Sequence, residues 1–131
     1  MPTITVRDAT IYYQQAGTGP ALPFIHGMCG DARVWAGQVE RLADRFCCVT
    51  YDRRGHTRSG VGTEAESVAT HAADAAALIE ALGLVRPVVV GSSGGARIAV
   101  ELARTRPELL AGAVFSEPPI FSPKFPPVAR G

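Results

Sequence analysis

The sequence has no long apolar run and no excess of charge of one sign. No stretch approaches the roughly twenty apolar residues that are needed to cross a bilayer, and the N-terminus lacks the basic start and apolar core of a secretory signal. The formal net charge is +1 at pH 7, and the basic residues Arg53, Arg54 and Arg58 follow an acidic one, Asp52. We therefore expect a cytoplasmic protein with no membrane partner and no nucleic-acid partner.

Cysteine is scarce as well, and its number is odd. The three cysteines are Cys29, Cys47 and Cys48. Cys47 and Cys48 lie in a strand-like run, where neighbouring side chains point to opposite faces, so we do not expect them to pair. The prediction is free thiols in a reducing compartment, with neither a disulfide nor a metal site. Nothing in the sequence indicates a bound cofactor.

What the sequence does contain is a regular alternation of apolar segments. Hydrophobic residues make up 47% of the chain and charged residues 19%, which is typical of a globular domain. Strand-like runs alternate with helical segments, and this predicts βαβ units, a parallel sheet and the α/β class. The expected strands cover residues 4–6, 10–13, 22–25, 46–51, 87–90 and 110–115, and the expected helices begin after Asp31, after Ser67 and at Gly94. Proline avoids central strands, so Pro23 is expected at the start of its strand.

The end of the sequence has a different composition. Five of the ten prolines lie between residues 118 and 131, and proline neither continues a helix nor donates to a sheet. We expect residues 1–119 to form the N-terminal part of a single domain. Residues 120–131 are expected to form a proline-rich connector toward an absent cap or C-terminal part.

The segment Gly91-Ser92-Ser93-Gly94-Gly95 lies between a predicted strand and a predicted helix. This is the G-x-S-x-G pattern, in which a strained turn exposes the serine hydroxyl at the edge of the sheet. The helix N-terminus then points free amides at charge that develops on a substrate. The alternative is a glycine-rich turn that only packs or binds phosphate. The spacing does not match G-x-G-x-x-G, and no P-loop lysine follows.

Two further segments carry a family resemblance. His26-Gly27-Met28 follows a predicted strand, and residues 52–59 have the sequence D-R-R-G-H-T-R-S. Together with the G-x-S-x-G turn, they resemble the α/β-hydrolase superfamily with a serine nucleophile, of the AB hydrolase-1 type, from about residue 10 to residue 119. The resemblance implies a mostly parallel sheet flanked by helices, truncated after about the sixth strand.

The resemblance also implies roles for single residues. Ser93 matches the nucleophile, and the backbone amides of Met28 and Gly94 match the two donors of the oxyanion hole. The positions that support these two motifs are His26, Gly27, Gly91 and Gly95.

Other matched positions are expected to have no catalytic role. Thr57 stands where the family usually has glycine, and a positive φ there would store about 1–3 kcal/mol of strain. His56 is expected to be a solvated loop residue. His71 and Asp74 are expected on the second helix, with Asp74 supporting that helix.

A serine nucleophile favours acyl transfer, whereas epoxide hydrolases and haloalkane dehalogenases of this superfamily use aspartate. We expect Ser93 to form an acyl-enzyme with a small-molecule carbonyl substrate such as an ester, thioester or lactone. The fold orders its triad as serine, acid, histidine, but His26, His56 and His71 all precede Ser93. Glu117 is the one local candidate for the acid, unless it is only a polar residue at the entry to the cap. The chain is therefore expected to be a truncated, inactive fragment.

Two alternatives belong to other functional classes. The chain could be a noncatalytic remnant that binds a small molecule or a protein, or a Rossmann-like nucleotide-binding domain, which the glycine spacing disfavours. A sheet that ended at the sixth strand would also leave that edge unpaired, which would allow self-association.

Overall fold

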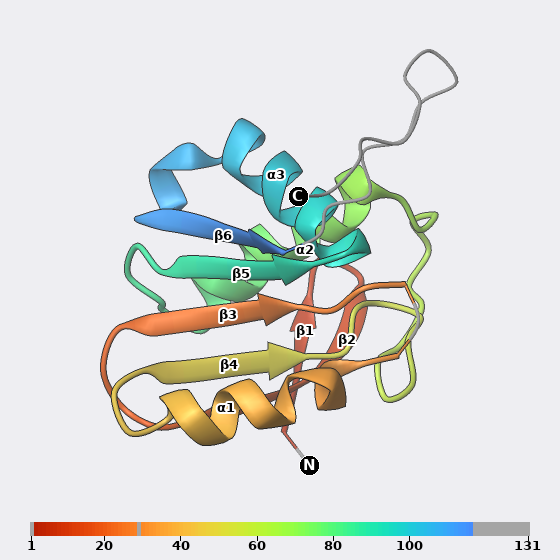
Figure 1. The fold of residues 1–131 in the computed structure, drawn as a ribbon. Coiled ribbons are helices and arrows are strands. Elements are labelled where there is room, and N and C mark those ends of the chain that lie inside the picture. The colour runs from red at the N-terminus through yellow and green to blue at the C-terminus, as the bar shows by residue number, and fades with distance from the viewer. Residues whose placement is uncertain (1, 29, 117–131) are drawn as a thin grey trace, which may run out of the picture.

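The computed structural model describes residues 2–28 and 30–116. Within them, six strands form one sheet in the order β1-β2-β4-β3-β5-β6 (Figure 1). The strands are β1 (Thr3–Val6), β2 (Ala9–Ala16), β3 (Ala21–Ile25), β4 (Cys47–Tyr51), β5 (Val88–Ser92) and β6 (Gly112–Ser116). β2 pairs antiparallel with β1 and β4, and the other three pairings are parallel. The predicted α/β class with a mostly parallel sheet is confirmed.

Helices cover both faces of this sheet. The helical elements are η1 (Ala32–Trp35), α1 (Ala36–Leu42), α2 (Val68–Ala81), α3 (Gly94–Thr105) and η2 (Pro107–Leu109). α1 lies against one face, whereas α2 and α3 pack on each other against the opposite face (Figure 1). This three-layer arrangement follows from the alternation of strands and helices along the chain.

The alternation of side chains along each strand creates two separate cores. Phe24 belongs to a small cluster with Trp35 of η1, and the rings of these two residues lie 5.0 Å apart. Ile25, the next residue of β3, belongs to the larger cluster beneath α2 and α3, together with Val89 and Leu102. Successive residues of a strand point to opposite faces, so one strand supplies both cores.

The polar residues before two helices act as N-caps, as predicted. The Asp31 carboxylate accepts a hydrogen bond from the backbone N–H of Arg33 at the start of η1, and the Ser67 hydroxyl accepts one from Thr70 at the start of α2. After α2, Gly83 has a φ of 65°, which a glycine adopts without strain.

Several strand boundaries differ from the sequence prediction by one to three residues, and the place of Pro23 within its strand differs as well. Pro23 is the third residue of β3 and not its first, so the prediction for this residue was wrong. The central strand tolerates it because Pro23 is paired with Val49 of β4, whereas pairing with β5 begins only at Phe24. β5 continues to Ser92, two residues beyond the predicted end, because it pairs with β6 in parallel up to Ser116.

β6 is the last strand of the sheet within the described residues. It pairs with β5 on one side, and its Val114 and Phe115 are 51% and 44% exposed. Self-association through this edge stays a prediction. The proposed connector, residues 120–131, lies outside the described residues.

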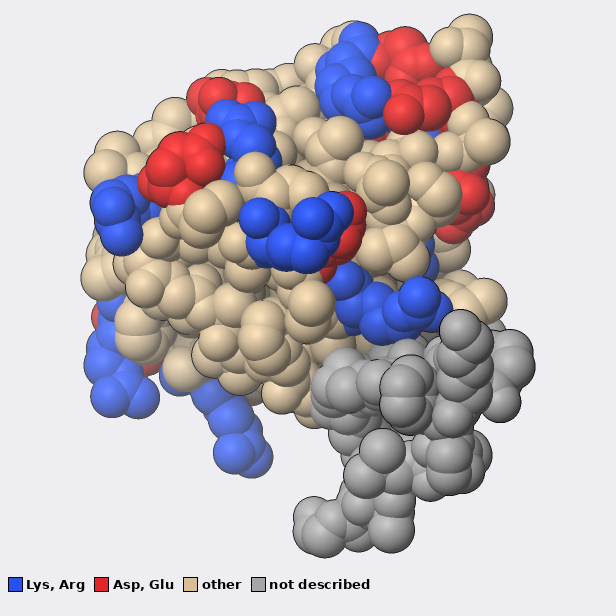
Figure 2. Space-filling view, turned by 90° about the horizontal axis from the view of Figure 1, so that it is seen from above, with Lys and Arg blue, Asp and Glu red and all other residues tan. Residues whose placement is uncertain are grey.

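Charged side chains lie in mixed groups. On the face seen in Figure 2, basic side chains lie beside acidic ones. The ion pairs of the described residues include Arg104–Glu101 and Arg106–Glu108. No helix of the described residues is long and apolar enough to cross a membrane.

Candidate active site

Ser93 occupies the turn between β5 and α3. Its backbone has φ 55° and ψ −121°, a conformation that L-residues rarely adopt, and its side chain is exposed. The Ser93 N–H donates to the carbonyl of Ser116 at 2.9 Å, and its carbonyl accepts from the N–H of Ala96 at 2.9 Å. The backbone of the turn is therefore held from both sides, while the hydroxyl makes no capping hydrogen bond to the helix.

Glycines flank the serine because the backbone packs too closely for a β-carbon. A β-carbon on Gly91 would overlap the carbonyl oxygen of Gly95. A β-carbon on Gly95 would overlap the carbonyl oxygen of Ile25 in β3. The first glycine thus allows the tight turn, and the second allows α3 to approach the sheet.

The loop after β3 lies directly against this turn. A β-carbon on Gly27 would lie 3.3 Å from the Ser93 β-carbon, and one on Gly94 would lie 3.4 Å from the Met28 backbone nitrogen. The amides of Met28 and Gly94 donate no hydrogen bond to any residue that the structure describes. Two backbone donors with no described partner therefore lie together beside Ser93.

The peptide between Gly27 and Met28 is fixed in orientation by buried side chains. The Gly27 carbonyl accepts from His26 Nδ1 at 2.7 Å and from Arg53 Nη2 at 2.8 Å. In a trans peptide the N–H points opposite to the C=O, and the described residues contain no cis peptide. Holding this carbonyl therefore directs the Met28 N–H away from Arg53.

His26 is buried and uses both ring nitrogens in this arrangement. Its Nε2 accepts from the backbone N–H of Arg53 at 3.0 Å, so Nδ1 carries the proton that is donated to Gly27. Burial is the main cause that lowers the pKa of His26 to about 4, and the nearby charge of Arg53 adds to it. At neutral pH, His26 is a neutral structural residue with no free nitrogen.

None of the three histidines hydrogen-bonds Ser93 in the structure. His26 holds the Gly27 peptide, and His56 and His71 both contact Glu66. Glu117, the candidate acid, lies outside the described residues. The structure thus brings together Ser93, Met28, Gly94 and their supporting residues, and within residues 2–28 and 30–116 no histidine hydrogen-bonds the serine.

The comparison with known proteins identifies the family. Residues 20–129 match the family described as the alpha/beta hydrolase fold. This chain belongs to the alpha/beta hydrolase family. It is 38% identical over 118 residues to the uncharacterised hydrolase YraK of Bacillus subtilis, covering 88% of this chain and 44% of that protein. It is 39% identical over 127 residues to a non-heme chloroperoxidase of Streptomyces lividans, covering 92% and 46%.

Solved structures agree with this assignment. A thermophilic esterase from Thermogutta terrifontis superposes with a TM-score of 0.83 at 28% identity, covering 88% of this chain and 45% of that one. The chain spans a little under half the length of each of these relatives. The chain therefore has the alpha/beta hydrolase fold of its family, and the sequence of the turn at Ser93 matches the G-x-S-x-G pattern.

The loop after β4 of this hydrolase fold begins with buried charged residues. Asp52 accepts from the N–H of Ala32 at 2.9 Å and from the guanidinium of Arg58 at 2.7 Å. These hydrogen bonds help to lower the pKa of the Asp52 carboxyl although burial opposes them. Thr57 has a φ of 37°, so the condition under which strain was expected at this position is met.

The basic cluster is internal and not a surface patch. Arg54 is fully buried, and its Nε and Nη2 donate to Asp74 of α2 at 2.6 and 2.8 Å. Asp8 pairs with the same guanidinium at 2.8 Å. Asp74 therefore supports the position of α2, as predicted, but through a buried ion pair that no sequence signal indicated.

His56 is not the solvated residue that was predicted. Its ring lies 4.9 Å from the ring of His26, and its Nε2 contacts Glu66 Oε1 at 2.9 Å. The same oxygen contacts Nε2 of His71, on α2, also at 2.9 Å. These two contacts are the largest causes that lower the pKa of the Glu66 carboxyl.

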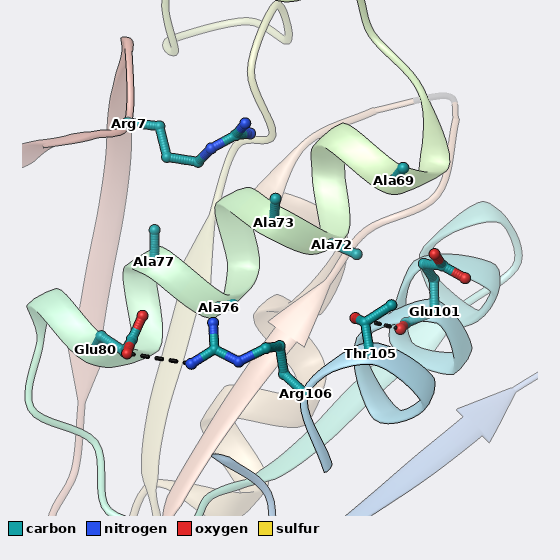
Figure 3. Close-up of a pocket in the computed structure, with 10 residues that line it drawn as sticks. All are labelled: Arg7, Ala69, Ala72, Ala73, Ala76, Ala77, Glu80, Glu101, Thr105 and Arg106. Atoms are coloured by element: carbon teal, nitrogen blue, oxygen red, sulfur yellow. Dashed lines mark hydrogen bonds and ion pairs between the residues drawn. The ribbon is translucent and has the colours of Figure 1, made fainter. Parts of the chain in front are cut away.

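A cavity of about 440 Å³ lies away from the nucleophile, between α2 and α3. Figure 3 shows the alanines of α2 on one side and Glu101 and Thr105 of α3 on the other, with Arg106 bonded to Glu80. Thr105 is twelve residues beyond Ser93, roughly 18 Å along the helix. This alanine-lined cavity is therefore separate from the serine site.

Proposed function

We propose that this chain carries the nucleophile and oxyanion hole of an acyl-transfer hydrolase, with Ser93 as the nucleophile. The observation that carries the proposal is the meeting of two amides, those of Met28 and Gly94, beside an exposed serine at positive φ. A turn with this strain persists only where the surrounding structure enforces it, and such strain concentrates at functional sites.

In the proposed reaction, Ser93 Oγ attacks the carbonyl carbon of the substrate and its proton passes to a base. The carbonyl oxygen becomes negative, and the amides of Met28 and Gly94 donate to it. When the intermediate collapses, the leaving group departs with a proton and the acyl group stays on Ser93. Water then hydrolyses the acyl-enzyme by the same steps.

His26 and Arg53 are proposed to act on this reaction only through the Gly27 peptide. Both donate to its carbonyl and so orient the Met28 N–H. Preorganised donors are effective because they need no rearrangement when charge develops. His26 is therefore proposed as a positioning residue and not as the base.

The substrate class is proposed to be small carbonyl compounds, namely esters, thioesters or lactones. The Met28 side chain is 79% exposed, and its Cγ would lie 3.3 Å from a β-carbon on Gly94. It therefore lies beside the oxyanion amides, where an acyl group would bind, and offers an apolar, adaptable surface.

The experiment measures acylation of the chain by p-nitrophenyl acetate, with the modified residue located by mass spectrometry. Because no histidine contacts Ser93, imidazole is added as a diffusible base. We expect an acetyl group on Ser93, formed faster with imidazole, and none in Ser93→Ala. Ser67 is the matched control, since it is also an exposed serine at the N-cap of a helix.

A second candidate is a noncatalytic binding module, and the specific observation in its favour is that no described histidine hydrogen-bonds Ser93. Equal acetylation of Ser93 and Ser67 in the folded chain would support that candidate and contradict the proposed nucleophile.

A further inference from the structure

His56, Glu66 and His71 form a compact group beside His26, whose ring contacts that of His56. Their nearest donor atoms, two imidazole nitrogens and one carboxylate oxygen, all lie within 4.8 Å of one another. His56 and His71 each place Nε2 at 2.9 Å from the same Glu66 Oε1. Among the described residues, this is the one group of three with metal-binding side chains at such distances.

We propose that His56, Glu66 and His71 bind a divalent transition-metal ion, with Zn²⁺ the best fit. Two imidazoles and one carboxylate are a donor set that zinc uses, with water in the fourth position. Zinc bonds of about 2.0–2.2 Å in a tetrahedron place neighbouring donor atoms roughly 3.3 Å apart. The carboxylate oxygen would move back by a few tenths of an ångström from its 2.9 Å contacts. The two imidazole nitrogens, which lie within 4.8 Å of each other, would have to approach by up to about 1.5 Å to reach this spacing.

The two imidazoles come from hydrogen-bonded segments of the backbone, and the carboxylate is exposed to solvent. His71 lies on the first turn of α2 and is buried. His56 lies in a turn closed by two hydrogen bonds, from its own N–H to the Arg53 carbonyl and from the Ser59 N–H to the His56 carbonyl, both at 2.9 Å. The Glu66 side chain is 53% exposed, so solvent and a metal ion can reach it.

The ring of His71 is oriented toward this point and toward no other. Its Nδ1 is buried and has no hydrogen-bond partner among the described residues, so Nε2 alone directs the ring. Burial is the main cause that lowers the pKa of His71. The neutral imidazole that a metal requires is thus the form present at neutral pH.

One charged group opposes the ion. Arg53 Nη1 lies 3.7 Å from Glu66 Oε1, and a guanidinium there repels a dication. We therefore expect an affinity below that of a dedicated structural zinc site. A bound ion would cross-link the 52–66 loop to α2. This link would lie beside His26, whose ring contacts that of His56. This inference does not depend on the chemistry of Ser93.

The test is titration of the full chain with Zn²⁺, followed by calorimetry and by thermal unfolding. We expect one ion per chain. The unfolding midpoint should rise by roughly 5–10 °C at a zinc concentration about 100-fold above the dissociation constant. Glu66→Gln and His56→Asn, both at partly exposed positions, should each weaken binding by at least about 10- to 100-fold. Glu64→Gln, at a neighbouring exposed carboxylate outside the group, should leave binding unchanged.

Cobalt distinguishes this site from the cysteines. Co²⁺ bound by imidazole and carboxylate lacks the thiolate-to-cobalt charge-transfer band, and the expected spectrum lacks that band. Three results would overturn the proposal. They are no saturable binding, equal binding by Glu66→Gln and Glu64→Gln, or a thiolate band that is retained in the His56→Asn variant. The first of these would mean that Glu66 serves only as a shared hydrogen-bond acceptor.

Discussion

The two loops that flank the Gly27–Met28 peptide are held in opposite ways. The turn at residues 91–95 is held by close contact of backbone atoms, with glycines where a β-carbon would overlap a carbonyl. The loop at residues 52–66 is held by side-chain charges, of which Arg54 and Asp52 are fully buried and paired. One loop therefore depends on the absence of side chains, and the other depends on their charge.

This difference predicts which substitutions and solution conditions each loop should tolerate. Backbone contact between uncharged groups is insensitive to salt and pH but intolerant of added volume. Buried ion pairs tolerate neither the loss of one partner nor a change of its protonation state. Substitutions that add a methyl group and substitutions that remove a charge should therefore separate the two regions.

The largest expected effect comes from removing charge in the 52–66 loop. Arg54→Met leaves the buried Asp74 carboxylate with only the longer contact to Arg7, at 3.2 Å. We expect a loss of about 3–5 kcal/mol in the free energy of unfolding, measured by urea denaturation. Arg106→Met removes an exposed arginine of two ion pairs and should cost about 0–1 kcal/mol. Similar losses in both variants would contradict the account of this loop.

The second-largest expected change in unfolding free energy comes from adding one methyl group to the 91–95 turn. Gly95→Ala would push a β-carbon into the Ile25 carbonyl, and we expect a loss of about 3 kcal/mol or more in unfolding free energy. Gly37→Ala, on α1, meets no atom within 4 Å and should stabilise the helix by about 0.5–1 kcal/mol. A neutral Gly95→Ala would show that α3 does not pack as closely as described.

Low pH should reduce the stability of the fold through His26, which holds the Gly27–Met28 peptide between the two loops. The pKa of His26 is about 4 in the folded protein and about 6.5 in the unfolded chain. Its contribution is therefore fully present above pH 6.5 and is lost as the pH falls toward 4. We expect the wild type to lose about 2–3 kcal/mol more than His26→Gln between pH 7 and pH 4. Parallel pH profiles for the two proteins would show that His26 is not held neutral.

The smallest expected effect is a gain in stability. Ser93→Gly relieves the positive φ of the turn and should raise the unfolding free energy by about 1 kcal/mol. Ser67→Gly is the matched control, because Ser67 has an extended backbone and caps α2, so its loss should lower stability by a few tenths of a kcal/mol. A destabilised Ser93→Gly variant would mean that the turn stores no strain at this residue.

The sequence predicted the fold and the serine turn because both depend on local patterns. The alternation of strands and helices gave the parallel sheet, and the caps at Asp31 and Ser67 marked where helices begin. The G-x-S-x-G turn is equally local, since its five residues include both Ser93 and the glycines that the close packing requires.

The contacts of the 52–66 loop could not be predicted because they join residues across irregular backbone. Nothing local indicates that Arg54 meets Asp74 or that Glu66 binds two histidines, and His56 was wrongly expected in solvent. Pro23 was misplaced for a related reason. Its tolerance depends on where β5 begins to pair, which only the three-dimensional register decides.

The most direct test of the central claim is a crystal structure of the chain with a boronic acid bound covalently to Ser93 Oγ. The tetrahedral boronate mimics the intermediate of acyl transfer. The account predicts one boronate oxygen at about 2.7–3.1 Å from both the Met28 and the Gly94 amide nitrogens. A boronate whose oxygens face solvent and touch neither amide would contradict the proposed oxyanion hole.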